Sequence, residues 1–150
     1  MRVIIQRVKR CSVEVEGDII GKIEKGLAIL LGIEEADTQE DIDWLCGKVS
    51  RLRIFDDENG VMNLDIQQAG GSAIVISQFT LFASTKKGNR PSYIRSAKEA
   101  VSKPMYEKFL KTLSEVLGED VEHGEFGADM QVSLVNDGPV TICIDSKNRE

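Results

Sequence analysis

Two short polar stretches carry the side chains that could do chemistry in this sequence. One is Ser77-Gln78-Phe79-Thr80-Leu81, which brings two hydroxyls and an amide to the expected end of a buried strand, after the apolar residues 73–76. The other is Asn136-Asp137-Gly138-Pro139-Val140-Thr141, close to the C-terminus. Binding and catalytic groups are commonly built where a rigid element ends in a polar loop. We therefore expect these two stretches to form one catalytic pocket.

The hydroxyls of Ser77 and Thr80 are weak nucleophiles, because no base stands next to them in the sequence. No Gly-x-Ser-x-Gly pattern surrounds them, and the only histidine, His123, lies in a Glu-His-Gly-Glu context typical of an exposed loop. We expect the hydroxyls to orient a substrate or a water, while backbone N–H groups at the strand end hold a carbonyl oxyanion. A polar strand end that only satisfies its own backbone is the alternative.

The dipeptide Gly138-Pro139 admits two interpretations. Glycine allows a positive φ, and proline fixes φ and lacks an N–H donor, so the pair fits a hairpin turn. The same properties make a rigid wall with few side-chain atoms. Such a wall can exclude one enantiomer of a small substrate through a clash with that enantiomer's side chain. The residue types alone leave both interpretations open.

Charge is distributed unevenly along the chain. The formal net charge is −6, yet the segment from Lys86 to Lys103 has a single acid, Glu99, against six basic residues. A locally basic segment can hold a phosphate backbone while the acidic remainder repels non-specific contacts. A solvated loop and helix face is the alternative interpretation. The basic residues are Lys86, Lys87, Arg90, Arg95, Lys98 and Lys103.

The elements that must position these groups begin with a long strand over residues 1–16. Arg7 falls on its apolar face, where a guanidinium is costly unless it finds acceptors. Either a local bulge turns Arg7 to solvent, or the side chain is braced against backbone carbonyls near a site. The apolar residues at alternate positions are expected to share one face of a sheet; they are Val3, Ile5, Cys11, Val13 and Val15.

Hydrophobic periodicity predicts two main helices packed on a largely antiparallel sheet. One helix has Asp37 or Thr38 as its N-cap, and the other begins near Ser102 and ends at Gly118. The sequence thus predicts a mixed α/β fold in a single domain of residues 1–150. The other strands are expected at residues 19–23, 27–33, 53–55, 62–66, 73–79, 130–135 and 140–144.

Composition narrows the class of protein further. No apolar run approaches the roughly 20 residues that a bilayer span needs, and the N-terminus turns polar too soon for a signal peptide. Three isolated cysteines indicate a reducing compartment rather than a disulfide framework or a zinc cluster. The acids of residues 56–58 lack the ligand pattern of an EF-hand. We expect a cytoplasmic protein with no metal, no cofactor and no membrane partner.

Several motifs together resemble those of one family. The two stretches that open this section resemble hallmark motifs of the D-aminoacyl-tRNA deacylases, and the resemblance covers essentially the whole chain with the motifs in order. It implies a cytosolic homodimer of mixed α/β fold that hydrolyses the ester between a D-amino acid and the 3′-terminal adenosine of tRNA. This chiral proofreading spares L-aminoacyl-tRNA and extends to glycine mischarged on tRNA(Ala). The further matching motifs are Gln6-Arg7-Val8, Met62-Asn63-Leu64, Arg90-Pro91-Ser92-Tyr93 and Met130-Gln131-Val132-Ser133-Leu134.

The resemblance also implies roles for individual residues. Gly138-Pro139 matches a Gly-cisPro element that, in the family, reaches from one subunit into the pocket of the other and rejects L-aminoacyl groups. Arg7 matches the arginine that helps to hold this element, and Met130 matches a position near the terminal adenine. The residues that match the floor of the family's pocket are Ser77, Gln78, Phe79 and Thr80. Phe79 is expected to act there through its backbone N–H.

The sequence leaves the route of attack and the function each with alternatives, and it assigns the tRNA contacts by charge. In this family either Thr80 is the nucleophile or the 2′-hydroxyl of the tRNA activates the attack, and the lack of a nearby base favours the 2′-hydroxyl. A non-catalytic RNA-binding dimer and a Ser/His hydrolase that uses Ser77 and His123 are the alternative functions. Charge, not motif, assigns the tRNA contacts to Lys86, Lys87, Arg90 and Arg95.

Overall fold

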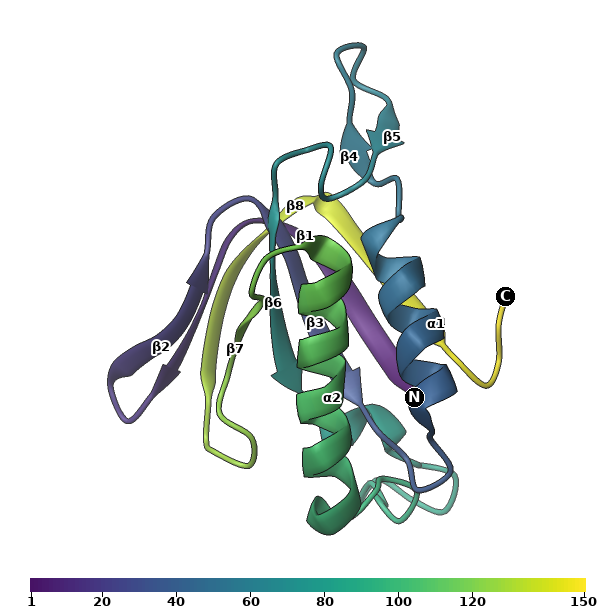
Figure 1. Ribbon diagram of the computed structural model, residues 1–150. Coiled ribbons are helices and arrows are strands. Elements are labelled where there is room, and N and C mark those ends of the chain that lie inside the picture. Colours follow the sequence, from purple (N-terminus) through teal and green to yellow (C-terminus); the bar gives the residue numbers. More distant parts are fainter.

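The computed structural model describes residues 1–150 as a curved sheet with two helices, α1 and α2, on one face (Figure 1). The strand order is β2-β1-β3-β6-β7, and β8 pairs with β1. The pairs β3–β6 and β6–β7 are parallel, and the other pairs of this sheet are antiparallel. The strands are β1 Arg2–Val15, β2 Asp18–Ile23, β3 Gly26–Gly32, β6 Ser72–Ser77, β7 Glu122–His123 and β8 Gln131–Asp145.

Helices and a small hairpin complete the fold. The hairpin of β4 and β5 projects from one end of the molecule, and the loops around η1 lie at the other end (Figure 1). This arrangement confirms the predicted mixed α/β fold with a largely antiparallel sheet and two main helices. No helix is both long enough and apolar enough to cross a membrane. The elements are α1 Gln39–Ser50, α2 Glu99–Leu117, the 3-10 helix η1 Phe79–Phe82, β4 Phe55–Asp56 and β5 Met62–Leu64.

The sheet separates two apolar cores. The larger core lies between the sheet and the helices and contains Ile5 of β1 and Phe109 of α2. The smaller core lies on the other face, around Ile74 of β6. The sheet curls around this smaller core until β2 meets β7, where a Cβ built on Gly21 would lie 2.5 Å from the carbonyl oxygen of His123. Only glycine permits this approach, which gives the sheet its barrel-like shape.

The prediction that the apolar residues of β1 share one face is wrong. Val3 and Ile5 belong to the core under the helices, whereas Cys11 and Val13 belong to the smaller core. The pairing of β1 with β8 shifts register between Gln6 and Arg10. An extra residue in a strand reverses the faces of all residues that follow it. The period of two therefore holds within each half of β1 but not across the whole strand.

The prediction of two separate C-terminal strands is also wrong, and so is the hairpin-turn interpretation of Gly138-Pro139. Leu134, before Gly138-Pro139, pairs with Cys11, and Ile142, after it, pairs with Ile5 of the same strand β1. The chain therefore continues in one direction through β8. Gly138-Pro139 interrupts a strand at the edge of the sheet instead of reversing the chain.

The first helix starts as expected, and the second starts earlier. Thr38 is the N-cap of α1 and forms a capping box. α2 begins at Glu99 rather than near Ser102, and it contains Pro104. Proline disfavours helix at the preceding residue, but the buried stripe of α2 packs in the larger core, and this packing outweighs the local preference. Gly118 ends the helix with a φ of 71°, as predicted.

Candidate active site

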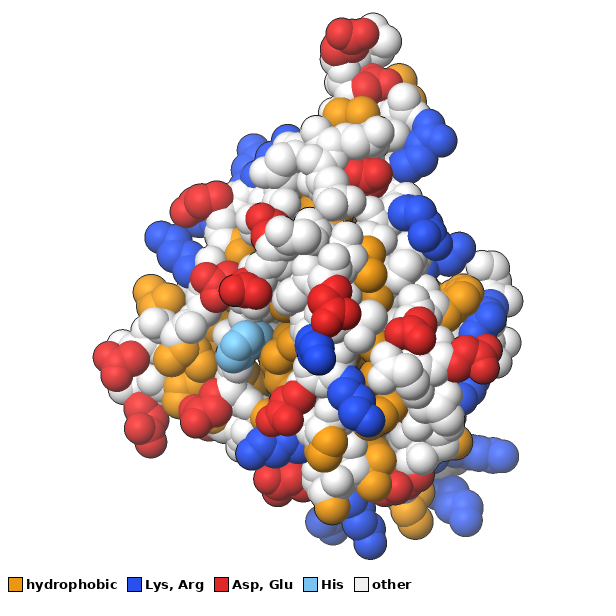
Figure 2. Space-filling model, viewed as in Figure 1, with side chains coloured by type: hydrophobic (Ala, Val, Ile, Leu, Met, Phe, Trp, Pro, Cys, Tyr) orange, Lys and Arg blue, Asp and Glu red, His pale blue; other side chains and the backbone are white.

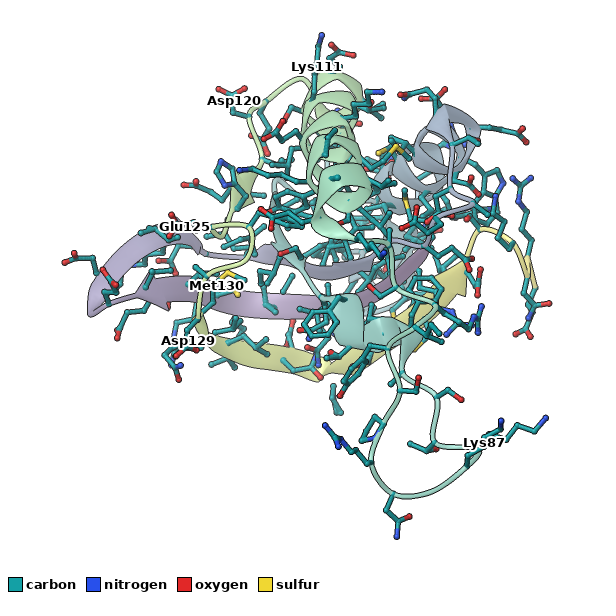
Figure 3. The ribbon with its side chains drawn as sticks, turned by 90° about the horizontal axis from the view of Figure 1, so that it is seen from below. Lys87, Lys111, Asp120, Glu125, Asp129 and Met130 are labelled. Carbon is teal, nitrogen blue, oxygen red and sulfur yellow. The ribbon has the colours of Figure 1, made fainter.

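A pocket with a volume of about 310 Å³ opens where β6 ends. Its walls come from the end of β6, from η1, from the first turn of α2 and from the segment that leads into β8. Figure 3 shows Asp129 and Met130 on this last segment. The pocket brings together four residues predicted for the site: Ser77, Gln78, Phe79 and Met130.

The end of β6 holds backbone and side-chain donors in a fixed arrangement. The strand ends at Ser77, earlier than the expected residue 79, because the chain turns into η1 at Phe79. The N–H of Gln78 still donates to the carbonyl of Leu31 at 2.8 Å. The first N–H groups of a helical turn have no partner inside that turn. The N–H of Phe79 therefore stands at the strand end, beside the pocket that its residue lines.

Thr80 has no base beside its hydroxyl. Its hydrogen-bond partner is the side-chain amide of Gln78, whose NH₂ group donates to the Thr80 oxygen. An amide nitrogen does not accept a proton, and Thr80 does not line the pocket. A threonine hydroxyl needs an adjacent base or a lowered pKa to become a strong nucleophile. This geometry favours a positioning role for Thr80.

Arg7 is buried, with 7% of its surface exposed, and is braced against backbone carbonyls. Its Nε donates to the carbonyl of Asp137 at 3.2 Å, and its Nη1 donates to the carbonyl of Ile54 at 2.6 Å. The carboxylates of Asp56 and Asp137 each lie 3.4 Å from the guanidinium. The structure therefore confirms the interpretation in which Arg7 is held by backbone carbonyls, and not the one in which a bulge turns it to solvent. The register of β1 with β8 shifts around Arg7, between Gln6 and Arg10, but the side chain stays buried.

Asn136 holds the interruption of β8 from the other side. Its Nδ2 donates to the carbonyl of Arg7 at 3.0 Å and to the carbonyl of Val140 at 2.9 Å. The peptide bond between Gly138 and Pro139 is cis, and both residues are exposed. The two side chains Arg7 and Asn136 therefore fix an exposed, side-chain-poor protrusion on the outer strand of the sheet.

The two stretches that we expected to form one pocket do not meet within the chain. The pocket is lined by the first stretch, and neither Gly138 nor Pro139 contributes to its wall. Both stretches are built as rigid structures, one at the end of a central strand and one on an edge strand. One chain by itself thus holds the two parts of the predicted site at separate places.

Lys86, Lys87, Arg90 and Arg95 lie on the loop of residues 83–98 between η1 and α2, which we call the basic loop. Backbone hydrogen bonds of 2.8 and 2.9 Å between Ser84 and Ser92 close the base of this loop, and Figure 3 shows Lys87 at its outer end. Figure 2 shows Lys and Arg side chains along the same end of the molecule. Arg95 lies closer to the body, 3.5 Å from the carboxylate of Glu34. Lys86, Lys87 and Arg90 are exposed.

The Ser77–His123 pair of the hydrolase alternative is not formed. His123 is exposed and belongs to the short edge strand β7 rather than to a loop. Its Nδ1 lies 2.7 Å from the carbonyl oxygen of Gly124, and no hydrogen bond joins it to Ser77. The two residues line different hollows. The geometry therefore offers no serine activated by this histidine.

Several residues of the pocket wall were not predicted from the sequence. Phe126, Gly127 and Asp129 line it from the segment before Met130, and Ser96 lines it from the loop before α2. Asp129 is the only ionisable side chain in the wall. Its Oδ1 accepts a hydrogen bond from Nε2 of Gln131 at 3.4 Å. Proximity to Met130 was the only local signal for these residues. Their approach to β6 depends on the fold and not on sequence distance.

Comparisons with known proteins agree with this fold. The family model described as D-Tyr-tRNA(Tyr) deacylase matches residues 4–145. A Bacteroides fragilis (strain YCH46) protein named D-aminoacyl-tRNA deacylase is 64% identical over 150 residues, which cover 100% of both chains. A Flavobacterium johnsoniae protein of the same name is 63% identical over 150 residues, again 100% of both chains. The chain therefore belongs to the D-Tyr-tRNA(Tyr) deacylase family.

Two solved structures have the same architecture. One is described as c-Myc DNA Unwinding Element Binding Protein and has a TM-score of 0.91 at 37% identity, covering 97% of this chain and 98% of that one. The other is described as a probable eukaryotic D-amino acid tRNA deacylase and has a TM-score of 0.82. Its 15% identity, over 95% of this chain and 97% of that one, supports likeness of fold alone.

Proposed function

We propose that this protein hydrolyses the ester bond of D-aminoacyl-tRNA and releases free D-amino acid and tRNA. Membership of the family and the shared name of relatives above 60% identity support this activity. The observation that carries it is the pocket at the end of β6, where Ser77, Gln78 and Phe79 line one small cavity. Such a site can polarise an ester carbonyl without a metal or a cofactor.

The reaction is the addition of water to the ester carbonyl. The N–H of Phe79 donates to the carbonyl oxygen as negative charge develops on it, and the bond to the ribose oxygen then breaks. The ribose oxygen takes up the proton that the attacking water loses, and the acid leaves as the carboxylate while its proton passes to the solvent. We assign activation of the water to the neighbouring 2′-hydroxyl of the tRNA, because the only partner of the Thr80 hydroxyl is the amide of Gln78.

Chiral selection belongs to Gly138-Pro139 of a second copy of the chain. The support for this assignment is that the element is exposed and held rigidly by Arg7, yet does not line the pocket of its own chain. Placed across a homodimer interface, its backbone would leave room for the hydrogen of a D-amino acid but not for an L side chain. Glycine has no side chain to reject, so glycyl-tRNA(Ala) is also a substrate.

The proposed substrate implies that the protein binds tRNA and works where aminoacyl-tRNA is present. The exposed Lys86, Lys87 and Arg90, together with Arg95, contact the tRNA backbone through charge. Met130 lines the pocket, and we place the terminal adenine beside it. We place the protein in the cytoplasm, where aminoacyl-tRNA is made and where its three free cysteines stay reduced.

A paired assay tests the function. Purified protein is incubated with D-Tyr-tRNA and, separately, with L-Tyr-tRNA, and the remaining ester is measured over time. Release of D-tyrosine, with the L-ester as stable as in buffer, is the expected result. Equal hydrolysis of both esters would contradict chiral selection, and no turnover of any aminoacyl-tRNA would leave the non-catalytic RNA-binding dimer as the better assignment.

A further inference from the structure

Two exposed aromatic side chains form a pair at the pocket. The ring centroids of Phe79 and Tyr93 lie 5.1 Å apart at an angle of 74°, which is a favourable edge-to-face arrangement. Phe79 is 57% exposed and Tyr93 is 38% exposed. The pair holds both rings in place while much of their surface remains in contact with water. Large exposed apolar groups that lie together commonly mark an interaction site.

The position of the pair fits a chain that leaves the pocket. Phe79 lines the pocket itself. Tyr93 lies on the basic loop, and its carbonyl accepts a hydrogen bond at 3.0 Å from Ser96, another residue of the pocket wall. A cavity of about 310 Å³ is at the small end of ligand sites, and the proposed function places the terminal nucleoside there. A nucleotide attached to that nucleoside must lie outside, next to the wall.

Charge identifies the kind of partner. Lys86, Lys87 and Arg90 are exposed on the loop that carries Tyr93 and form no ion pair with an acid of the chain. Basic side chains that follow a phosphate backbone, combined with aromatic rings that stack on bases, are how proteins bind single-stranded nucleic acid without sequence preference. The cations and the rings together therefore fit a single strand of nucleic acid.

We infer that Phe79 and Tyr93 are a stacking platform for the base of the nucleotide that precedes the terminal adenosine of the tRNA. This inference rests on the proposed function, because it takes the esterified adenosine to occupy the pocket. The role of Phe79 then has two parts: its N–H serves the ester, and its ring, with Tyr93, orders the strand that carries the ester. The loop cations bind the phosphates on the same side.

The test compares two substrates that differ only beyond the terminal nucleoside. One is a D-tyrosylated minihelix with a single-stranded CCA end, and the other is 3′-O-D-tyrosyl-adenosine. Tyr93→Leu removes the ring, and the matched control Tyr93→Phe keeps it. Tyr93→Leu is expected to lower kcat/KM about tenfold on the minihelix, mainly through KM, because stacking on one base is worth about that factor. The loss on the adenosine ester should be at least fivefold smaller, and Tyr93→Phe should match the wild type.

Other outcomes overturn the platform. An equal loss on both substrates would mean that Tyr93 supports the pocket and does not contact a second nucleotide. A change of oligomeric state in Tyr93→Leu, measured by sedimentation at the assay concentration, would mean that a second copy covers the rings. If the wild type hydrolyses neither substrate, the proposed function fails. The affinity for a minihelix that carries no amino acid, measured by fluorescence anisotropy, then tests the stacking platform. Equal affinities of Tyr93→Leu and Tyr93→Phe contradict the platform, and weaker binding by Tyr93→Leu supports it.

Discussion

The guanidinium of Arg7 and the carbonyl of Asp137 are joined by a hydrogen bond of 3.2 Å between residues 130 positions apart in the sequence. The same guanidinium binds the carbonyl of Ile54, before the β4–β5 hairpin. One buried side chain thus ties the protrusion at Gly138-Pro139 to the body of the protein. An arginine on an apolar strand face would be costly without these acceptors, so its position and the shape of the protrusion depend on each other.

Arg7→Ala should therefore change both stability and selectivity. The substitution leaves two carbonyls without their donor, and we expect the free energy of unfolding in urea to fall by about 2–4 kcal/mol. Hydrolysis of L-Tyr-tRNA should become measurable, because the wall is no longer held. The control is Arg53→Ala, in which an exposed arginine loses a bond to the carbonyl of Asn63, with an expected cost below about 1 kcal/mol. Unchanged exclusion of the L-ester in Arg7→Ala would separate the arginine from chiral selection.

Thr80→Val distinguishes the two routes of attack. Valine keeps the shape of threonine and removes the hydroxyl that accepts the Gln78 amide. If the 2′-hydroxyl of the tRNA activates the water, we expect kcat on D-Tyr-tRNA to fall by less than about tenfold, as for the loss of a positioning contact. A fall of three orders of magnitude or more, with a stable fold, would identify Thr80 as the nucleophile. A D-Tyr-tRNA with a 2′-deoxy terminal adenosine provides the complementary test, since the wild type should hydrolyse it very slowly.

Local patterns predicted most elements, and long-range pairing explains where they failed. The buried strand β3, the capped start of α1 and the αL glycine after α2 depend on neighbouring residues and were predicted correctly. The face switch within β1 and the continuous β8 depend on the register between two strands more than 110 residues apart. The same is true of the site: residues 77–79 were found by motif, but the wall at Phe126–Asp129 approaches them only in the folded chain.

His123→Ala should leave the deacylation rate within a factor of two. The side chain is exposed, its Nδ1 faces a neighbouring carbonyl, and it lines a different hollow from Ser77. Rates are measured on D-Tyr-tRNA between pH 6 and 8, where a catalytic histidine would give a change of slope. A loss of a hundredfold or more would restore the Ser/His hydrolase as the mechanism.

Asp41→Asn should lower stability in a pH-dependent way. Burial would raise the pKa of Asp41, but hydrogen bonds from Ser146, Lys147 and the backbone of Thr38 outweigh it and hold the pKa below its ordinary value. Because the folded pKa is depressed, the stabilisation is complete above the unfolded value, near pH 4, and is lost as the pH falls toward the folded value. We expect the variant to be less stable by about 1–3 kcal/mol at pH 7, with the difference narrowing steadily below about pH 4. Asp43→Asn, at an exposed position of the same helix, is the control, and a difference independent of pH would contradict the role of the charge.

Gly21→Ala tests how the sheet closes. A Cβ at this position would lie 2.5 Å from the carbonyl oxygen of His123, closer than two such atoms can approach, and the obstacle is backbone. β2 and β7 must then move apart. We expect the free energy of unfolding, measured in urea, to fall by about 1–3 kcal/mol, the usual cost of overpacking. Gly47→Ala in α1 is the matched control, since its new methyl meets only the flexible end of Arg51 at 3.3 Å. That variant should gain about 0.5–1 kcal/mol from helix propensity. Equal behaviour of the two alanine variants would mean that the contact between β2 and β7 does not limit the curvature of the sheet.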